Sequence, residues 1–295
     1  PNGAAIPYVY FYGVNASNTA NFYKHGLLYQ QFGVANNTKV TYNWTAPVIV
    51  TDSSTVVLYH LDNNSVYGEN QTKAYDFVNS VYNLTKAGNA FPNMTGGKFA
   101  GAWTFDGNGD YLTAGTTTQI IIGQGNVTFS AWVKRAGDAL SGLTETIIQE
   151  GDQLGGGYYL VTDCYLDNNI GFGISHSGTN FYSAQASQTL VTDGNWHNLV
   201  GVYSNSSNFL NLYVDGVLQG TSSTDGVIPS GYTEGFTVGG FVQGGERYSP
   251  CSVDDYVASS FNGTIDEVGV WNRTLSSVEI LDLYRLRGQK YYWKV

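Results

Sequence analysis

The sequence predicts an all-β fold, a sandwich of two antiparallel sheets with one short C-terminal helix and an N-terminal strand extension. From about residue 55 onward, short runs of β-forming residues recur between Gly, Asn and Asp turns, which is typical of antiparallel sandwiches. A convincing helical pattern occurs only late, from Ser276, which argues against an alternating α/β fold. Apolar residues make up 42% of the chain and charged residues 12%, which excludes disordered and coiled-coil proteins.

The first predicted element is a strand over residues 5–14 whose two faces are both apolar. One face carries Ile6, Tyr8, Tyr10, Tyr12 and Val14, and the other carries Val9 and Phe11. Because exposure of such a strand to water favours aggregation, we expect it to be buried between sheets, with its pairing broken or edge-like at Pro7. We predict an N-terminal extension over residues 1–50, which contains this strand and a hairpin within residues 26–50, and a sandwich domain over residues 51–295.

Alternating apolar residues predict the strands of the sandwich. One face of a strand carries Val127, Phe129, Ala131 and Val133, and one face of another carries Leu210, Leu212 and Val214. Asp215-Gly216 then predicts a tight hairpin, because both positions tolerate a positive φ. The turn-forming run Asp106–Asp110, between Phe105 and Tyr111, predicts a second hairpin.

The last element is the helix that begins at Ser276. The Ser276 hydroxyl can cap the helix while Glu279 reaches back toward it, which is the pattern of a capping box. We expect the helix to end before Gly288.

Four segments together resemble the laminin-G-like group of the concanavalin A-like lectin/glucanase superfamily. They are GKFAGAWTFDGNGDYL at 97–112, VTFSAWV at 127–133, DGNWHNLV at 193–200 continuing to LYVDGV at 212–217, and GTIDEVGVWNRTL at 263–275. Their order and spacing extend the resemblance over residues 55–286. The resemblance implies a two-sheet jelly roll, with Trp196 and Trp271 at positions that are usually packing residues.

The same resemblance implies a structural calcium ion between the first and last strands of the sandwich. It places carboxylate oxygens at Asp62 and Asp266, with backbone carbonyls near Gly96-Gly97. Two carboxylates with carbonyls and water suffice for Ca²⁺, which prefers hard oxygen ligands. The alternative is that Asp266 accepts local backbone hydrogen bonds.

The motifs of several enzyme classes are missing from the sequence. Retaining glucanases of this superfamily carry Glu-x-Asp-x-x-Glu on one strand, because hydrolysis needs two carboxyl groups about 5 Å apart, and no such spacing occurs. The motifs His-Glu-x-x-His and Gly-x-Ser-x-Gly are also missing. Asp106-x-Asn108-x-Asp110 resembles the start of an EF-hand loop, but Tyr111 stands at the required Gly, so we expect a turn. We predict a protein that is not an enzyme.

Charge and sequons indicate a secreted or cell-surface glycoprotein. The net charge of −10 would repel nucleic acid, and no run of about 18 apolar residues could span a membrane. Random placement of the Asn, Ser and Thr residues predicts about four N-glycosylation sequons; the alternative to modification is accidental matches on an Asn- and Thr-rich β surface. The chain has eleven acceptors for N-linked glycans, Asn15, Asn36, Asn43, Asn63, Asn70, Asn83, Asn93, Asn126, Asn205, Asn262 and Asn272.

The two cysteines, Cys164 and Cys251, allow one disulfide. In an oxidising compartment this bridge would contribute about 4–5 kcal/mol in the chain-entropy model. Two inert buried thiols are the alternative.

Two functions follow from these features. The apolar strand at residues 5–14 favours a subunit of a glycosylated, pilus-like surface filament, in which each copy donates its strand to the next copy in a head-to-tail homopolymer. The strand could instead fold back onto its own sandwich or dock on a different partner. The resemblance favours a secreted carbohydrate-binding or adhesion module, whose partners would be glycans.

Overall fold

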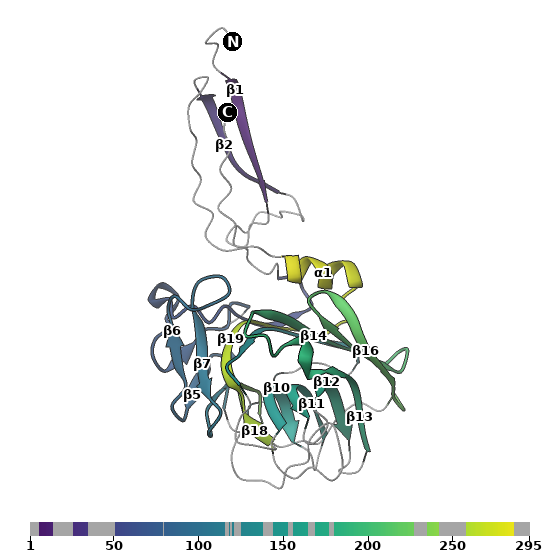
Figure 1. Cartoon of the computed structure of the whole chain (residues 1–295). Helices are drawn as coiled ribbons and strands as arrows, with labels where there is room; N and C mark the ends of the chain where they lie inside the picture. The colour runs from purple at the N-terminus through teal and green to yellow at the C-terminus, as the bar shows by residue number, and fades with distance from the viewer. Residues whose placement is uncertain are drawn as a thin grey trace. The chain divides into compact units, whose positions relative to one another are not determined.

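The structure is a computed structural model, and the chain divides into two units, residues 1–52 with 286–295 and residues 53–285 (Figure 1). At residues 6–13 and 26–34, and at a few other strand positions, the structure describes the backbone alone. The described residues are 6–13, 26–34, 51–78, 80–115, 118, 120, 125–137, 144–152, 156–164, 169–176, 180–226, 235–241 and 258–285.

In the first unit, β1 (Ile6–Gly13) pairs antiparallel with β2 (Gly26–Val34). The register runs from Ile6 opposite Val34 to Gly13 opposite Gly26, with an irregularity between Phe11 and Tyr12. The strand predicted at the start of the chain therefore pairs with a segment of the same chain, in a two-stranded sheet separate from the sheets of the sandwich. The second half of the predicted hairpin, residues 39–44, lies outside the described residues.

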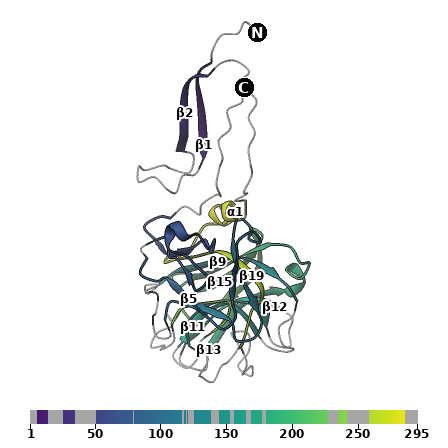
Figure 2. The same ribbon diagram turned by 90° about the vertical axis from the view of Figure 1, so that its left-hand side faces the viewer.

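The second unit is a sandwich of two sheets (Figure 2). One sheet has the order β16-β15-β14-β9-β19-β7-β6, with β3 paired to β19. Its strands are β3 (Thr55–Tyr59), β6 (Phe91–Asn93), β7 (Ala102–Asp106), β9 (Val127–Arg135), β14 (His197–Ser204), β15 (Phe209–Val214), β16 (Val217–Ser223) and β19 (Asn262–Trp271).

The other sheet has the order β13-β12-β11-β10-β17-β8-β5-β4, with β18 paired to β10. Its strands are β4 (Lys73–Ala74), β5 (Leu84–Ala87), β8 (Tyr111–Thr113), β10 (Thr144–Asp152), β11 (Gly156–Cys164), β12 (Asn169–His176), β13 (Asn180–Ser187), β17 (Thr237–Val238) and β18 (Ala258–Ser260). Among the described pairs only β10 and β18 run parallel. The all-β sandwich and its two antiparallel sheets are thus confirmed, and the architecture is that of a jelly roll.

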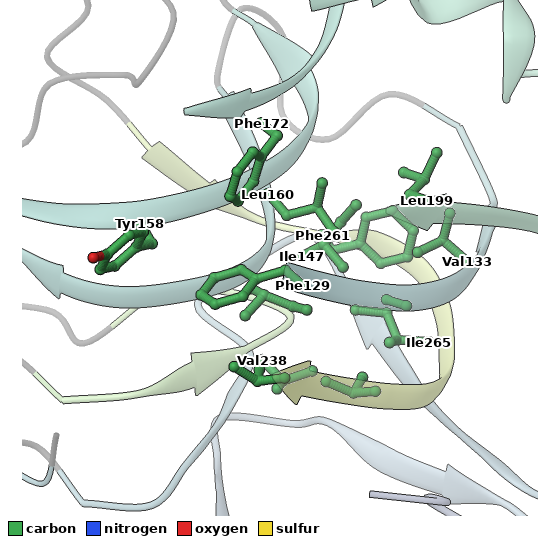
Figure 3. Close-up of a cluster of buried hydrophobic side chains, with 14 of the residues drawn as sticks. Phe129, Val133, Ile147, Tyr158, Leu160, Phe172, Leu199, Val238, Phe261 and Ile265 are labelled. Carbon is green, nitrogen blue, oxygen red and sulfur yellow. The ribbon is translucent and has the colours of Figure 1, made fainter. Parts of the chain in front are cut away.

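The core lies between the two sheets, where alternating side chains from both layers meet (Figure 3). The four predicted residues of β9, from Val127 to Val133, are all fully buried, and β15 alternates buried and half-buried residues as the pattern predicts. Phe129 from one sheet packs against Tyr158 and Phe172 from the other, with ring centroids 6.0 and 5.7 Å apart. Burial of these side chains is the main source of stability for such a sandwich.

The hairpin predicted around Asp106–Asp110 is wrong. β7 and β8, on either side of it, lie in different sheets and do not pair. The Asp110 carboxylate accepts hydrogen bonds from the Asp106 amide (3.0 Å) and from the Asn89 amide. The turn is therefore tight, but it carries the chain from one sheet to the other. The structure confirms the turn that we expect in place of an EF-hand loop.

The second predicted hairpin and the helix are confirmed. Val214 pairs with Val217, and the two residues of the turn, Asp215 and Gly216, have φ values of 52° and 77°, respectively. The helix α1 (Ser277–Arg285) begins with a capping box, in which the Glu279 amide donates to the Ser276 hydroxyl (3.3 Å) and the Ser276 amide to the Glu279 carboxylate (2.8 Å). Two short 3₁₀ helices, η1 (Ser65–Tyr67) and η2 (Gln188–Leu190), complete the described elements. Among the described helices none is long and apolar enough to cross a membrane.

Candidate functional site

A kink in β19 brings two consecutive acidic side chains into the protein interior. The register between β19 and β9 breaks between Asp266 and Gly269, and Glu267 has φ 51°, in the left-handed region that non-glycine residues seldom adopt. A bulge of this kind re-aims the side chains around it. Asp266 and Glu267 are almost completely buried as a result, with 0% and 1% exposure.

Asp266 and Asp62 both hold the same loop, residues 98–101. One oxygen of Asp266, Oδ2, accepts hydrogen bonds from the amides of Lys98 (2.7 Å) and Phe99 (3.2 Å). Asp62 Oδ1 accepts from the Gly101 amide at 2.9 Å. The predicted pair of carboxylates therefore comes together on one loop, 204 positions apart in the chain.

The loop approaches Asp62 closely because Gly101 in the loop and Gly97 just before it have no side chains. A Cβ atom at Gly101 would lie 2.7 Å from the Asp62 backbone, and one at Gly97 would overlap the Gly101 carbonyl. Any larger residue at either position would push the loop away from the two carboxylates.

His60 and Glu267 form an ion pair beside these carboxylates. His60 Nδ1 lies 2.9 Å from Glu267 Oε2 and 3.0 Å from Oε1. Burial alone lowers the pKa of His60, but the charge and the hydrogen bond of Glu267 outweigh burial, and the net effect is a raised pKa. Glu69, which is 1% exposed, adds another buried carboxyl group that interacts electrostatically with His60 and Asp62.

Negative charge is in excess in this group of residues, which we call the rim cluster: His60, Asp62, Glu69, Asp266 and Glu267. Burial, followed by the charges of Glu267 and Asp62, raises the pKa of Asp266 well above its usual value. Burial also raises the pKa values of Asp62, Glu69 and Glu267. A bound cation would offset this cost, because burying charge without a partner is unfavourable.

One carboxylate oxygen of the rim cluster is available to a hard cation. Asp266 Oδ1 is buried and accepts no hydrogen bond among the described residues, although Oδ2 accepts two. The described part of the chain has no group of three or more His, Cys, Asp or Glu residues placed to bind one metal ion. Backbone carbonyls and water would therefore have to complete a Ca²⁺ site at Asp62 and Asp266.

Sequence reasoning finds only part of the rim cluster. It misses His60 and Glu69, which lie outside the four segments that carry the resemblance, and Glu267, which lies in the segment at 263–275 but to which the resemblance assigns no role. The signals that point to them are local: a His two residues before Asp62, and a Glu next to Asp266.

The predicted glycosylation acceptors differ in exposure. Asn70 and Asn272 are exposed. Asn63 is half-buried, and its Oδ1 atom is buried without a hydrogen bond among the described residues. The remaining described acceptors are half-buried: Asn83, Asn93, Asn126, Asn205 and Asn262. The acceptors Asn15, Asn36 and Asn43 lie outside the described residues.

The structure leaves other predicted sites without a side-chain description. The side chains of Cys164 and Cys251 lie outside the described part, so the disulfide stays a prediction. The side chains of the predicted assembly strand are not described either. For this strand the structure gives only the backbone of β1, over Ile6–Gly13. Trp271 is buried, at 2% exposure, whereas Trp196 is half-buried.

Comparison with known proteins places the fold among lectin-like sandwiches. The family model Laminin_G_3, described as the concanavalin A-like lectin/glucanases superfamily, matches residues 106–281. A comparison with curated protein sequences finds no match.

Two solved structures illustrate the likeness. Domain 4 of an extracellular GH43 arabinanase from Geobacillus stearothermophilus, in complex with arabinotriose, has a TM-score of 0.55 and 18% identity, over 80% of this chain and 100% of that domain. The binding domain of botulinum neurotoxin serotype D has a TM-score of 0.54 and 15% identity, over 78% of this chain and 51% of that one. At these identities the likeness shows a shared fold, and both names describe binding or sugar-complexed domains.

Proposed function

Because the chain belongs to the concanavalin A-like lectin/glucanases superfamily, we propose that it is a secreted, non-enzymatic carbohydrate-binding module that serves in recognition or adhesion. The observation that carries this proposal is the arabinanase domain, which superposes over its full length and was solved with arabinotriose bound. The serotype D botulinum neurotoxin domain is likewise named as a binding domain, which supports recognition in general.

A non-catalytic role is in keeping with the contacts of the acidic residues in the rim cluster. Asp62 and Asp266 accept backbone hydrogen bonds from one loop, and Glu267 is paired with His60. Asp266 and Glu267 are almost completely buried, so neither can meet a sugar at the surface, as glycoside hydrolysis requires.

Glycan binding is the direct test. The full chain, labelled with a fluorophore, would be applied to an array of neutral, sialylated and sulfated oligosaccharides, and each hit would be titrated by calorimetry. We expect saturable binding with no release of reducing sugar on prolonged incubation. Lack of binding across the array would reject the module, and turnover of a bound oligosaccharide would reject its non-enzymatic character.

We also propose that Asp62 and Asp266 hold a structural Ca²⁺, which would neutralise buried carboxylates and brace the loop over residues 98–101. Calcium at a hundredfold excess over its dissociation constant would stabilise the folded state by about 2.7 kcal/mol. The melting temperature of the chain should therefore fall on treatment with EDTA and recover with CaCl₂. Asp266→Asn should remove this dependence on calcium; an unchanged melting temperature in EDTA for the unsubstituted chain would contradict the site.

A filament subunit is a second candidate, favoured by one observation. Among the described strands, β1 and β2 form a two-stranded sheet that shares no strand with the sheets of the sandwich, and a two-stranded sheet is marginally stable in water. Exchange of this element between copies would give the head-to-tail homopolymer that the sequence predicts. Negative-stain images should then show fibres for the full chain and none after deletion of residues 1–14; dispersed monomers in both preparations would exclude the filament.

A further inference from the structure

Three aromatic side chains gather at the surface on the segment between β3 and β5. We call Tyr67, Tyr75 and Phe77 the aromatic patch. The Tyr67 and Tyr75 rings meet Phe77 edge-on, with centroid distances of 4.8 and 5.4 Å and interplanar angles of 64° and 83°. Tyr67 is 47% exposed, and Tyr75 and Phe77 are half-buried. Large rings left this accessible are available to contact a ligand.

The loop that carries Tyr67 is held by hydrogen bonds at both of its ends. Asn64 caps η1 by accepting from the Val66 amide (3.0 Å), and Gly68, with φ 88°, closes the turn by donating to the Ser65 carbonyl (3.1 Å). A segment fixed in this way loses little entropy when it binds a ligand.

A buried carboxylate ties this loop to Tyr75, the residue that follows β4. Glu69 Oε2 accepts from the Asn64 amide at 2.8 Å, and Oε1 accepts from the Tyr75 amide at 3.3 Å. One side chain thus sets the spacing between Tyr67 and Tyr75. The patch is pre-formed, as binding sites for small ligands usually are.

The patch also joins the rim cluster. The third ring against Phe77 is His60, whose centroid lies 4.4 Å away at 67°, and His60 is paired with Glu267. Phe77 therefore packs against a buried ring, and exposed polar residues lie near Tyr67 and Tyr75 in the sequence, namely Ser65, Asn70, Gln71 and Thr72.

We propose that the aromatic patch is a binding site for a neutral saccharide. This inference rests on the proposed function and adds the residues that carry it. The C–H face of a sugar ring is apolar and stacks on an aromatic ring, while its hydroxyl groups pair with polar groups at the edge of the ring, such as the Tyr hydroxyls. The net charge of −10 and the nearby acidic rim cluster disfavour sulfated and sialylated glycans. The patch lies before residues 106–281, which the family model matches.

The test compares variants of the full chain, produced without N-glycosylation so that no glycan at Asn63 or Asn70 covers the rings. A panel of neutral arabino-, xylo-, gluco-, manno- and galacto-oligosaccharides is screened first. The tightest ligand is then titrated by calorimetry against Tyr67→Ala, Tyr67→Phe and Phe91→Ala. Phe91 is the matched control, because it is 50% exposed on β6 and outside the patch.

We expect Tyr67→Ala to weaken binding about three- to tenfold, the scale of one aromatic contact. Tyr67→Phe should keep most of the affinity, because it keeps the ring, and Phe91→Ala should bind like the unsubstituted chain. Hydrogen exchange should slow within residues 64–77 on saturation with the ligand. Equal affinities for Tyr67→Ala and the unsubstituted chain would overturn the patch while leaving glycan binding intact. No binding by the unsubstituted chain to any oligosaccharide would overturn both proposals.

Discussion

His197 lies between two carboxylates, and it can donate a hydrogen bond to both of them only when its imidazole is protonated. Its Nδ1 lies 2.8 Å from Asp215 Oδ2, and its Nε2 lies 2.8 Å from Asp193 Oδ1. A neutral imidazole donates from one nitrogen, whereas the imidazolium donates from both. The hydrogen bond with Asp215, opposed by burial and aided by Asp193, raises the pKa of His197.

This geometry predicts a pH-dependent contribution to stability. Since the pKa is raised on folding, the contribution is complete below the unfolded value of about 6.5 and is lost as the pH rises through the folded value. His197→Gln should cost on the order of 1 kcal/mol at pH 5.5 and much less at pH 9. Urea unfolding of both chains across this range gives the difference.

The comparison of the two chains is needed because His60, paired with Glu267, has a raised pKa as well. Its contribution is common to both proteins and cancels in the difference. A cost of His197→Gln that stays constant from pH 5.5 to 9 would show that folding does not shift the pKa of His197, and would contradict the prediction.

The sequons differ in whether a glycan can be accommodated. A glycan is bulky and must project into water, so we expect modification at Asn70 and Asn272, which are exposed, when the chain is secreted from eukaryotic cells. We expect little at Asn63, whose Oδ1 atom is buried. Peptide mapping by mass spectrometry, after enzymatic release of glycans, measures each site. High occupancy at Asn63 with none at Asn70 would contradict the assignment.

At the residue scale, the sequence indicates which side chains belong to the site but not which of them contact one another. Asp62 and Asp266 are predictable from the family pattern, whereas the pairing of His60 with Glu267 depends on two facts of the fold. Val268 lies opposite Tyr59 in the β3–β19 register, and Glu267 adopts a left-handed conformation. Neither the register nor the kink can be read from a spacing along the chain.

At the scale of the elements, α1 depends on a small network at its first turn. Glu279 accepts from the Ser276 amide and hydroxyl, each at 2.8 Å, and pairs with Arg273 at 2.8 Å. The hydrogen bond from Arg273, followed by those from Ser276, lowers the pKa of Glu279 to about 2 despite partial burial. The helix buries Ile280 and Leu283, so the start of the helix is coupled to the packing of its inner face.

We predict that Ser276→Ala destabilises the sandwich by about 1 kcal/mol, the usual cost of losing a helix cap. Ser277→Ala is the matched control, since Ser277 is exposed in the same turn and is not the cap. Because the pKa of Glu279 is depressed, its contribution is present above the unfolded value near 4.5 and is lost as the pH falls toward about 2. Denaturant midpoints of the three chains at pH 7 and pH 3 measure both effects; equal midpoints for the two serine variants at pH 7 would refute the cap.

Elements were predictable where the signal was local. The capping box fixes the start of α1, and two residues with positive φ fix the β15–β16 hairpin at Asp215-Gly216. The turn at Asp106–Asp110 fails as a hairpin because its sequence specifies a tight reversal but not a partner. β7 pairs with β19, more than 150 positions away, and only the closed core determines that choice.

At the scale of the whole molecule, the two units make separable contributions. Both sheets, the core and the aromatic patch lie within residues 53–285. A sandwich with a single contiguous core of this size should fold without the remainder of the chain. We therefore predict that residues 53–285 alone unfold in one cooperative transition and keep the oligosaccharide affinity of the full chain.

This truncation also separates the two candidate functions, because each assigns a different task to the first unit. If recognition is the function, the isolated sandwich retains glycan binding, and residues 1–52 serve only to place it. If assembly is the function, the same truncation abolishes fibres while glycan binding is weak or missing in both proteins. Calorimetry and electron microscopy on the full chain and the truncated chain therefore distinguish the two functions. If the truncated sandwich folds but loses an affinity that the full chain has, the first unit contributes to the binding site. The assignment of that site to the aromatic patch would then have to be revised.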